Sequence, residues 1–62
     1  MTDKVFLMTY KTSTGKDSYM AIHEETKAEA LRLFIANREP TDRLIGVSEM
    51  SKADYKAWLK SL

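Results

Sequence analysis

Residues 25–40 read ETKAEALRLFIANREP, and this stretch decides the fold. It predicts a helix with both ends marked. Thr26 stands where an N-cap residue is needed, and Glu29 three residues later completes a capping box. Pro40 cannot continue a helix, and it moves the residue before it out of the helical region. We therefore expect a helix from about residue 27 to residue 38, with the rest of the chain organised around it.

The apolar residues of this predicted helix recur at the helical period. Ala28, Leu31 and Ile35 fall near one face, and Phe34 lies beside them. A stripe of this kind is stable only when another element covers it. The strands predicted before and after the helix can supply that cover.

Alternating side chains predict three strands. Residues 4–12 and 18–24 form the first two, and residues 44–50 form the third. The polar residues 12–17, TSTGKD, predict a hairpin turn in which Gly15 can adopt a positive φ. Because the hairpin makes the first two strands antiparallel and the helix returns the chain to the sheet, we expect the first strand in the middle, paired antiparallel on both sides.

The period of two also assigns residues to the two faces of the sheet. The face under the first helix is expected to hold Phe6, Met8, Met20, Ile22, Ile45 and Val47. The second face is expected to hold Val5, Leu7, Tyr19, Ala21 and Leu44.

Residues 51–62, SKADYKAWLKSL, predict a second helix. Ser51 is its expected N-cap and Asp54 the partner in a capping box. Its apolar face is formed by residues at i, i+3, i+4 and i+7, namely Tyr55, Trp58, Leu59 and Leu62. This helix either covers the second face of the sheet or caps one of its edges, and the sequence does not choose between the two.

The predicted fold class is therefore α+β, in a single domain spanning residues 1–62. It is a three-stranded antiparallel sheet in β-β-α-β-α order, with one helix packed on the sheet and a C-terminal amphipathic helix. The chain has no cysteine, which excludes disulfides and thiolate metal sites. The start, MTDKVFLMTY, is too short and too polar for a signal peptide or a membrane span, so we expect a cytoplasmic protein with no membrane partner.

Two short motifs invite a chemical interpretation that the sequence does not support. His23, Glu24 and Glu25 are metal-ligand types, but adjacent residues at a strand end do not converge on one ion. Residues 13–16, STGK, resemble part of a phosphate loop, but the first glycine is missing and two antiparallel strands flank the stretch. We therefore predict no catalytic residue, no metal and no cofactor, and a protein that is not an enzyme.

Residues suited to binding a partner lie mainly in the second half of the chain. Lysines spaced four apart form a basic ridge on the C-terminal helix, and aromatic side chains and arginine are common anchors of interfaces. The predicted partner-binding residues are Tyr19, Arg43, Lys52, Tyr55, Lys56, Trp58 and Lys60. Ten basic against nine acidic residues give a net charge of +1, which argues against a dedicated nucleic-acid coat.

Residues 4–50 carry a resemblance to a known group of proteins. Two short strands precede Glu25-Thr26, the helix continues with Glu29-Ala30-Leu31 and Leu33, and a proline-led return leads to a third strand. This pattern resembles the small bacteriophage proteins that bind and inhibit host RNA polymerase. Proteins of that family carry arginines on their last strand. In this chain the last strand has Val47, Ser48 and Glu49, with Arg43 only at its start. The polymerase target therefore does not carry over.

The sequence and this resemblance together suggest a non-enzymatic protein-binding module. The resemblance implies a phage-type inhibitor that binds a host protein complex in the bacterial cytoplasm, with transcription and defence machinery both open as targets. One alternative is a nucleic-acid-binding accessory protein that uses the lysine ridge. Another is a structural homodimer.

Overall fold

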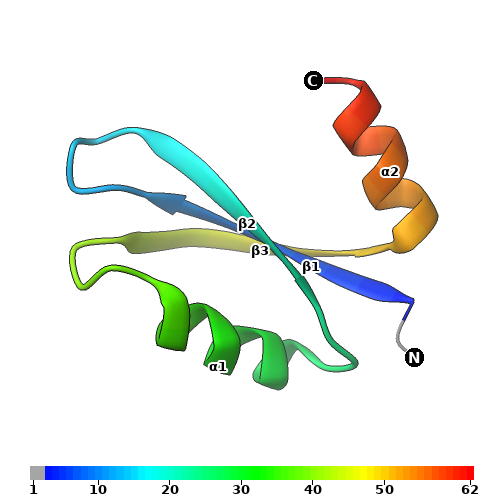
Figure 1. Ribbon diagram of the computed structural model, residues 1–62, viewed down its shortest axis with the longest axis horizontal. Coiled ribbons are helices and arrows are strands. Elements are labelled where there is room, and N and C mark those ends of the chain that lie inside the picture. The colour runs from blue at the N-terminus through cyan, green and yellow to red at the C-terminus, as the bar shows by residue number, and fades with distance from the viewer. Residues whose placement is uncertain (1–2) are drawn as a thin grey trace.

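The computed structural model describes residues 3–62, which form a three-stranded antiparallel sheet and two helices. The elements are β1 (Lys4–Lys11), β2 (Asp17–His23), α1 (Lys27–Asn37), β3 (Arg43–Ser51) and α2 (Lys52–Lys60). The sheet order is β2-β1-β3, and both outer strands run antiparallel to β1 (Figure 1). The predicted α+β class, the β-β-α-β-α order and the central position of the first strand are confirmed.

Local signals in the sequence set both ends of α1. The backbone N–H of Glu29 donates to the Thr26 hydroxyl at 3.3 Å, which satisfies one of the free donors in the first turn. The helix ends at Asn37, and the next residue, Arg38, is extended (φ −79°, ψ 157°), two positions before Pro40. The second helix begins in the same way, because the Asp54 N–H donates to the Ser51 hydroxyl at 3.1 Å. Both predicted N-caps are confirmed.

The main core lies between α1 and one face of the sheet. Its buried members are Phe6, Met8, Ile22, Ala30 and Phe34. The predicted stripe on the helix was partly wrong, because Ala28 is exposed and Ile35 is 61% exposed. The helix instead turns Ala30 and Phe34 inward, where small Ala30 lets it approach the sheet closely.

A β-bulge in β3 changes the faces predicted for two residues. Thr9 pairs with Gly46, but Tyr10 pairs with Leu44, so Ile45 is an extra residue in the register. Tyr10 packs on Phe34 of α1, with ring centroids 5.5 Å apart, and Leu44 therefore lies on the α1 side rather than the second face. Ile45 is 58% exposed, so the prediction that it lies buried under the first helix was also wrong.

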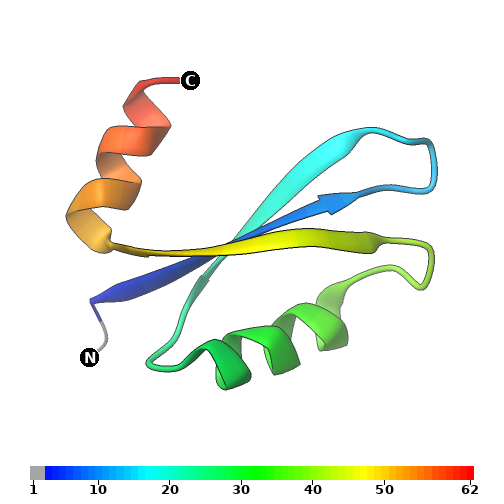
Figure 2. The same ribbon diagram turned by 180° about the vertical axis from the view of Figure 1, so that it is seen from behind.

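The second face of the sheet lies under α2, on the side away from α1 (Figures 1 and 2). Val5 and Leu7 are buried on this face. Tyr55 and Trp58 of α2 are half-buried and contact aromatic rings of β2, so the helix covers the face rather than capping an edge. Leu59 and Leu62, predicted to share the apolar face, are exposed, and Leu62 lies beyond the end of the helix.

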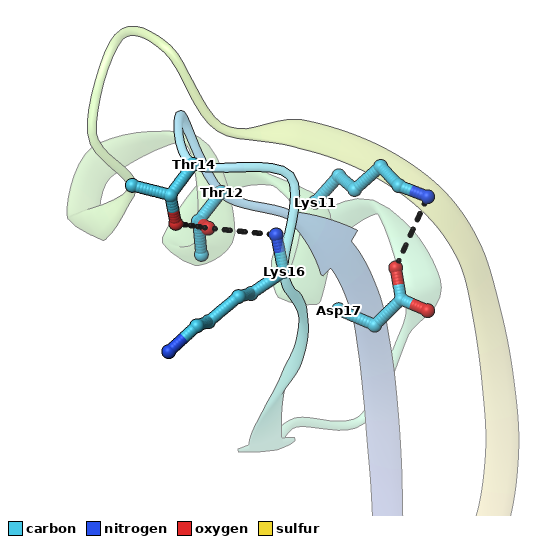
Figure 3. A network of polar contacts seen from close by, with 5 residues as sticks. All are labelled: Lys11, Thr12, Thr14, Lys16 and Asp17. Atoms are coloured by element: carbon cyan, nitrogen blue, oxygen red, sulfur yellow. Dashed lines mark hydrogen bonds and ion pairs between the residues drawn. The ribbon is translucent and has the colours of Figure 1, made fainter.

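The β1–β2 connection is the predicted hairpin turn. Gly15 has a φ of +82°, a conformation that costs a side-chain-bearing residue free energy. The Thr12 hydroxyl accepts from the Lys16 N–H at 3.3 Å and shares a hydrogen bond with the Thr14 hydroxyl at 3.0 Å. Lys11 and Asp17 close the end of the two strands with an ion pair at 3.4 Å, and the Lys16 side chain extends away from the threonines (Figure 3).

Candidate functional site

A hollow of about 460 Å³ lies between α1 and the start of β3. Helix residues at positions i, i+3, i+4 and i+7 form one wall, and the turn and the first strand residues form the other. The lining residues are Leu31, Phe34, Ile35, Arg38, Pro40, Asp42, Arg43 and Leu44. The volume lies within the range of small-molecule and side-chain binding pockets. We call this feature the α1–β3 hollow.

The hollow exists because the first part of β3 is not covered by the helix. α1 packs mainly over β2 and β1, so the apolar side chains at the start of β3 are only partly covered. Leu44 is 40% exposed on this side, and Ile35 on the helix is more exposed still. The bulge in β3 turns Leu44 to the α1 side, where its side chain forms the floor of the hollow. The face predicted for Leu44 was wrong for the same reason.

A hydrogen-bonded turn fixes the rim of the hollow. The Asp42 N–H donates to the Glu39 carbonyl at 3.0 Å, and the Asp42 carboxylate in return accepts from the Glu39 N–H at 3.0 Å. Arg38 donates from its guanidinium to the Asp42 carbonyl at 2.8 Å. Asp42 is only 8% exposed, and these bonds satisfy its backbone N–H, its carbonyl and one carboxylate oxygen in place of water. Asp42 is not among the residues singled out from the sequence, because its contacts form only when the turn closes.

The charged groups at the hollow are mainly positive. Arg38 and Arg43 are both exposed and line it, whereas the one carboxylate, that of Asp42, is buried and engaged by a backbone N–H. A guanidinium carries five N–H donors, and the contacts of Arg38 use one of them. The hollow therefore combines an apolar floor with guanidinium donors at its rim.

The predicted partner-binding residues separate into two groups in space. Tyr19, Tyr55 and Trp58 come together on the α2 side, and Arg43 lies at the α1–β3 hollow. The Tyr19 and Trp58 rings meet edge to face with centroids 4.8 Å apart, and Tyr55 stacks on Trp58 at 6.0 Å. His23 adds a further edge-to-face contact with Tyr55 at 6.0 Å. These rings hold α2 on the sheet, which is a structural role.

The lysine ridge lies on the same helix as this aromatic cluster. Lys56 and Lys60 are exposed, and Lys52 is half-buried with its backbone N–H bound to the Asp3 carbonyl at 2.9 Å. Tyr10 and Tyr19 lie on opposite faces of the sheet, since Tyr10 contacts Phe34 of α1 and Tyr19 contacts Trp58 of α2. The hairpin therefore does not present two aromatic rings side by side for stacked bases.

Neither of the two short motifs lines the α1–β3 hollow. Within residues 3–62, no three His, Cys, Asp or Glu side chains gather in a way that could hold a metal ion. His23 instead contacts Tyr55, and residues 13–16 belong to the hairpin turn. In the same described range, neither helix has the length and apolar character needed to cross a membrane.

The chain was compared with protein families, curated proteins and solved structures. No protein family, no curated protein and no solved structure was found to match the chain.

Proposed function

We propose that this chain is a non-enzymatic protein-binding module that contacts its partner through the α1–β3 hollow. The observation that supports this most directly is the apolar floor left open beside β3. Leu44 and Ile35 are well exposed there, although both are side chains that gain free energy from burial. An open apolar surface with a polar rim is the usual composition of a protein interface.

The chemistry of the rim supports a protein partner with acidic groups. Arginine is enriched at the centres of interfaces because its planar guanidinium can bind a carboxylate through two parallel hydrogen bonds. Arg38 and Arg43 both line the hollow, one just after the end of α1 and one at the start of β3. A partner would place an apolar side chain on the floor and a carboxylate between the walls.

We further propose that the partner is a complex of a bacterial host, and that the module acts there as a phage-type inhibitor by occupying a surface. The support for this step is the resemblance in element order to the phage inhibitors of host RNA polymerase. Transcription and defence machinery are both candidate targets, and the site of action would be the host cytoplasm.

The test compares two charge substitutions in an affinity purification from bacterial lysate. Leu44→Glu places a carboxylate on the apolar floor, and Lys56→Glu changes the exposed face of α2 without touching the hollow. We expect the wild-type chain and Lys56→Glu to recover the same stoichiometric partner and Leu44→Glu to lose it. Equal recovery by Leu44→Glu, with far-UV circular dichroism showing that the variant is folded, would overturn the assignment to the hollow.

Nuclease treatment of half of each sample separates the protein partner from the nucleic-acid alternative. A partner held through the hollow survives the treatment. If binding collapses with nuclease, weakens steeply with salt and is lost in Lys56→Glu, the lysine ridge on α2 is the working surface instead.

A further inference from the structure

The two edges of the sheet differ in how well they resist pairing with another strand. An edge strand presents a row of unpaired backbone groups, and proteins commonly block such rows with bulges, prolines or charged side chains. β3 has a bulge at Leu44–Gly46, with Arg43 and Glu49 along its length. β2 pairs in continuous register over all seven of its residues, and its inner positions, residues 18–22, carry no charge, proline or glycine.

The hairpin shows which backbone groups of β2 face outward. The Thr12 N–H donates to the Lys16 carbonyl at 2.9 Å, so this pair is hydrogen-bonded, and bonded and non-bonded pairs alternate along an antiparallel ladder. The residues of β2 bonded to β1 are then Ser18, Met20 and Ile22. The residues whose N–H and C=O point to the open edge are Asp17, Tyr19, Ala21 and His23. Among residues 3–62, β1 is the only strand paired with β2.

We propose that this edge binds β2 of a second copy of the chain, antiparallel across a two-fold axis at Met20. In this register every residue of the seven-residue strand has a partner, and Tyr19 pairs with Ala21 of the other copy. All the outward-facing groups then meet one another, which gives about eight backbone hydrogen bonds. The product is a continuous sheet with order β3-β1-β2-β2-β1-β3.

Side chains at the two ends of the strand complement each other in the same register. Asp17 and His23 both lie on the α2 side of the sheet, and the two-fold axis places the Asp17 of each copy opposite the other copy's His23. The Asp17 carboxylate accepts hydrogen bonds, and an imidazole N–H can donate one. In one copy alone, Asp17 has only an exposed ion pair with Lys11, and His23 is exposed. The dimer adds a hydrogen-bonding partner for each of these side chains, beside the Lys11 ion pair and the Tyr55 ring contact that are present within one copy.

The same pairing accounts for the exposure of Tyr19. This ring is 43% exposed beside the open edge, although its other side contacts Trp58. In the dimer the aromatic clusters of the two copies lie on the same face of the joined sheet, next to the two-fold axis. The α1–β3 hollows remain open, because β3 lies at the opposite edge from β2. The dimer therefore carries two hollows, and a partner with two matching segments would bind with increased avidity.

The first experiment measures mass against concentration by sedimentation. We expect twice the 7.1 kDa of one chain at high concentration, with a shift to single-chain mass on dilution. Ala21→Pro removes an outward-facing N–H at an edge, where proline is tolerated, and should give a folded monomer. A wild-type chain that stays at single-chain mass up to millimolar concentration would overturn the proposal.

A cross-linking experiment tests the register without relying on Ala21→Pro. In the proposed register, Met20 of one copy faces Met20 of the other in a non-hydrogen-bonded antiparallel pair. The Cα atoms of such a pair are about 4.5 Å apart, which a disulfide can bridge. Because the chain has no cysteine, Met20→Cys introduces a single thiol at the proposed axis, where the side chain is half-buried, and Ser48→Cys places a more exposed thiol on β3 as the control. We expect mild oxidation to convert Met20→Cys to a covalent dimer and to leave Ser48→Cys monomeric. Equal cross-linking of both variants, or of Ser48→Cys alone, would refute pairing through β2.

Discussion

Removal of the Trp58 ring tests whether α2 is held on the second face of the sheet as the structure shows. A fully buried tryptophan replaced by alanine costs about 3–5 kcal/mol of unfolding free energy. Trp58 is half-buried, so roughly half of this applies, about 2 kcal/mol. The ring contacts with Tyr19 and Tyr55 add about 0.5–1.5 kcal/mol together, because rings in favourable geometry contribute beyond their buried area. We expect Trp58→Ala to lose about 3 kcal/mol.

This loss is large compared with the whole stability of so short a chain. At about 0.05–0.15 kcal/mol per residue, a chain of 62 residues has an unfolding free energy of about 3–9 kcal/mol. For a domain of this size, a loss of about 3 kcal/mol lowers Tm by roughly 12–24 °C. Urea and thermal unfolding followed by far-UV circular dichroism measure both quantities, and this signal does not depend on the tryptophan that is removed.

Two further variants make the measurement specific. Trp58→Phe keeps an aromatic ring in the cluster and should lose about half as much as Trp58→Ala. Lys56→Ala changes an exposed residue of the same helix and should stay within about 0.5 kcal/mol of the wild-type chain. If Trp58→Ala also stays within about 0.5 kcal/mol, the aromatic cluster does not hold α2, and the account of the second face given above is wrong.

Substitutions at Phe34, Asp42 and Gly15 test the main core and the two turns, and two further substitutions serve as controls. Phe34→Ala empties the centre of the core, where the ring is almost fully buried, and should cost about 3–5 kcal/mol; we expect circular dichroism and NMR line shapes to show a largely unfolded chain. Asp42→Ala removes the acceptor of the Glu39 N–H and should cost about 1–2 kcal/mol by thermal melting, whereas Asp42→Asn keeps an acceptor and should cost less; equal losses would contradict this role. Gly15→Ala should lower the unfolding free energy by about 1–2 kcal/mol, because φ at this position is +82°. Gly46 has equally open space around its Cα but no positive φ, so Gly46→Ala should change the urea midpoint little.

The sequence by itself determined the elements, their order and the N-caps of both helices, whereas most of the other ends differ from the predicted ones by one or two residues. Thr26 and Ser51 cap the helices through bonds to residues three positions on, and Gly15 supplies the positive φ of the turn. These effects act over a few residues, so a linear pattern contains them. The antiparallel sheet with the first strand in the middle also follows, because a short hairpin and a helical return leave few other topologies.

The face of α1 that is buried was decided by tertiary packing. The apolar residues of α1 point in neighbouring directions around the helix axis. A small rotation of the helix therefore changes which of them face the sheet. The structure buries Ala30 and Phe34 and leaves Ile35 exposed, because small Ala30 lets the helix backbone approach the strands. Hydrophobicity alone ranks isoleucine above alanine and therefore predicts the opposite.

The candidate site depended on tertiary structure even more strongly. A single extra residue in β3 moved Leu44 to the α1 side and left Ile45 outside the regular register, and an alternation of period two cannot reveal such a shift. Of the residues that line the hollow, the sequence pointed to Arg43 but not to Arg38 and Asp42, which come together only when the turn closes. Short-range signals thus fixed the elements, whereas long-range packing set the register of one strand and the rotation of one helix, and these two features decided where the α1–β3 hollow lies.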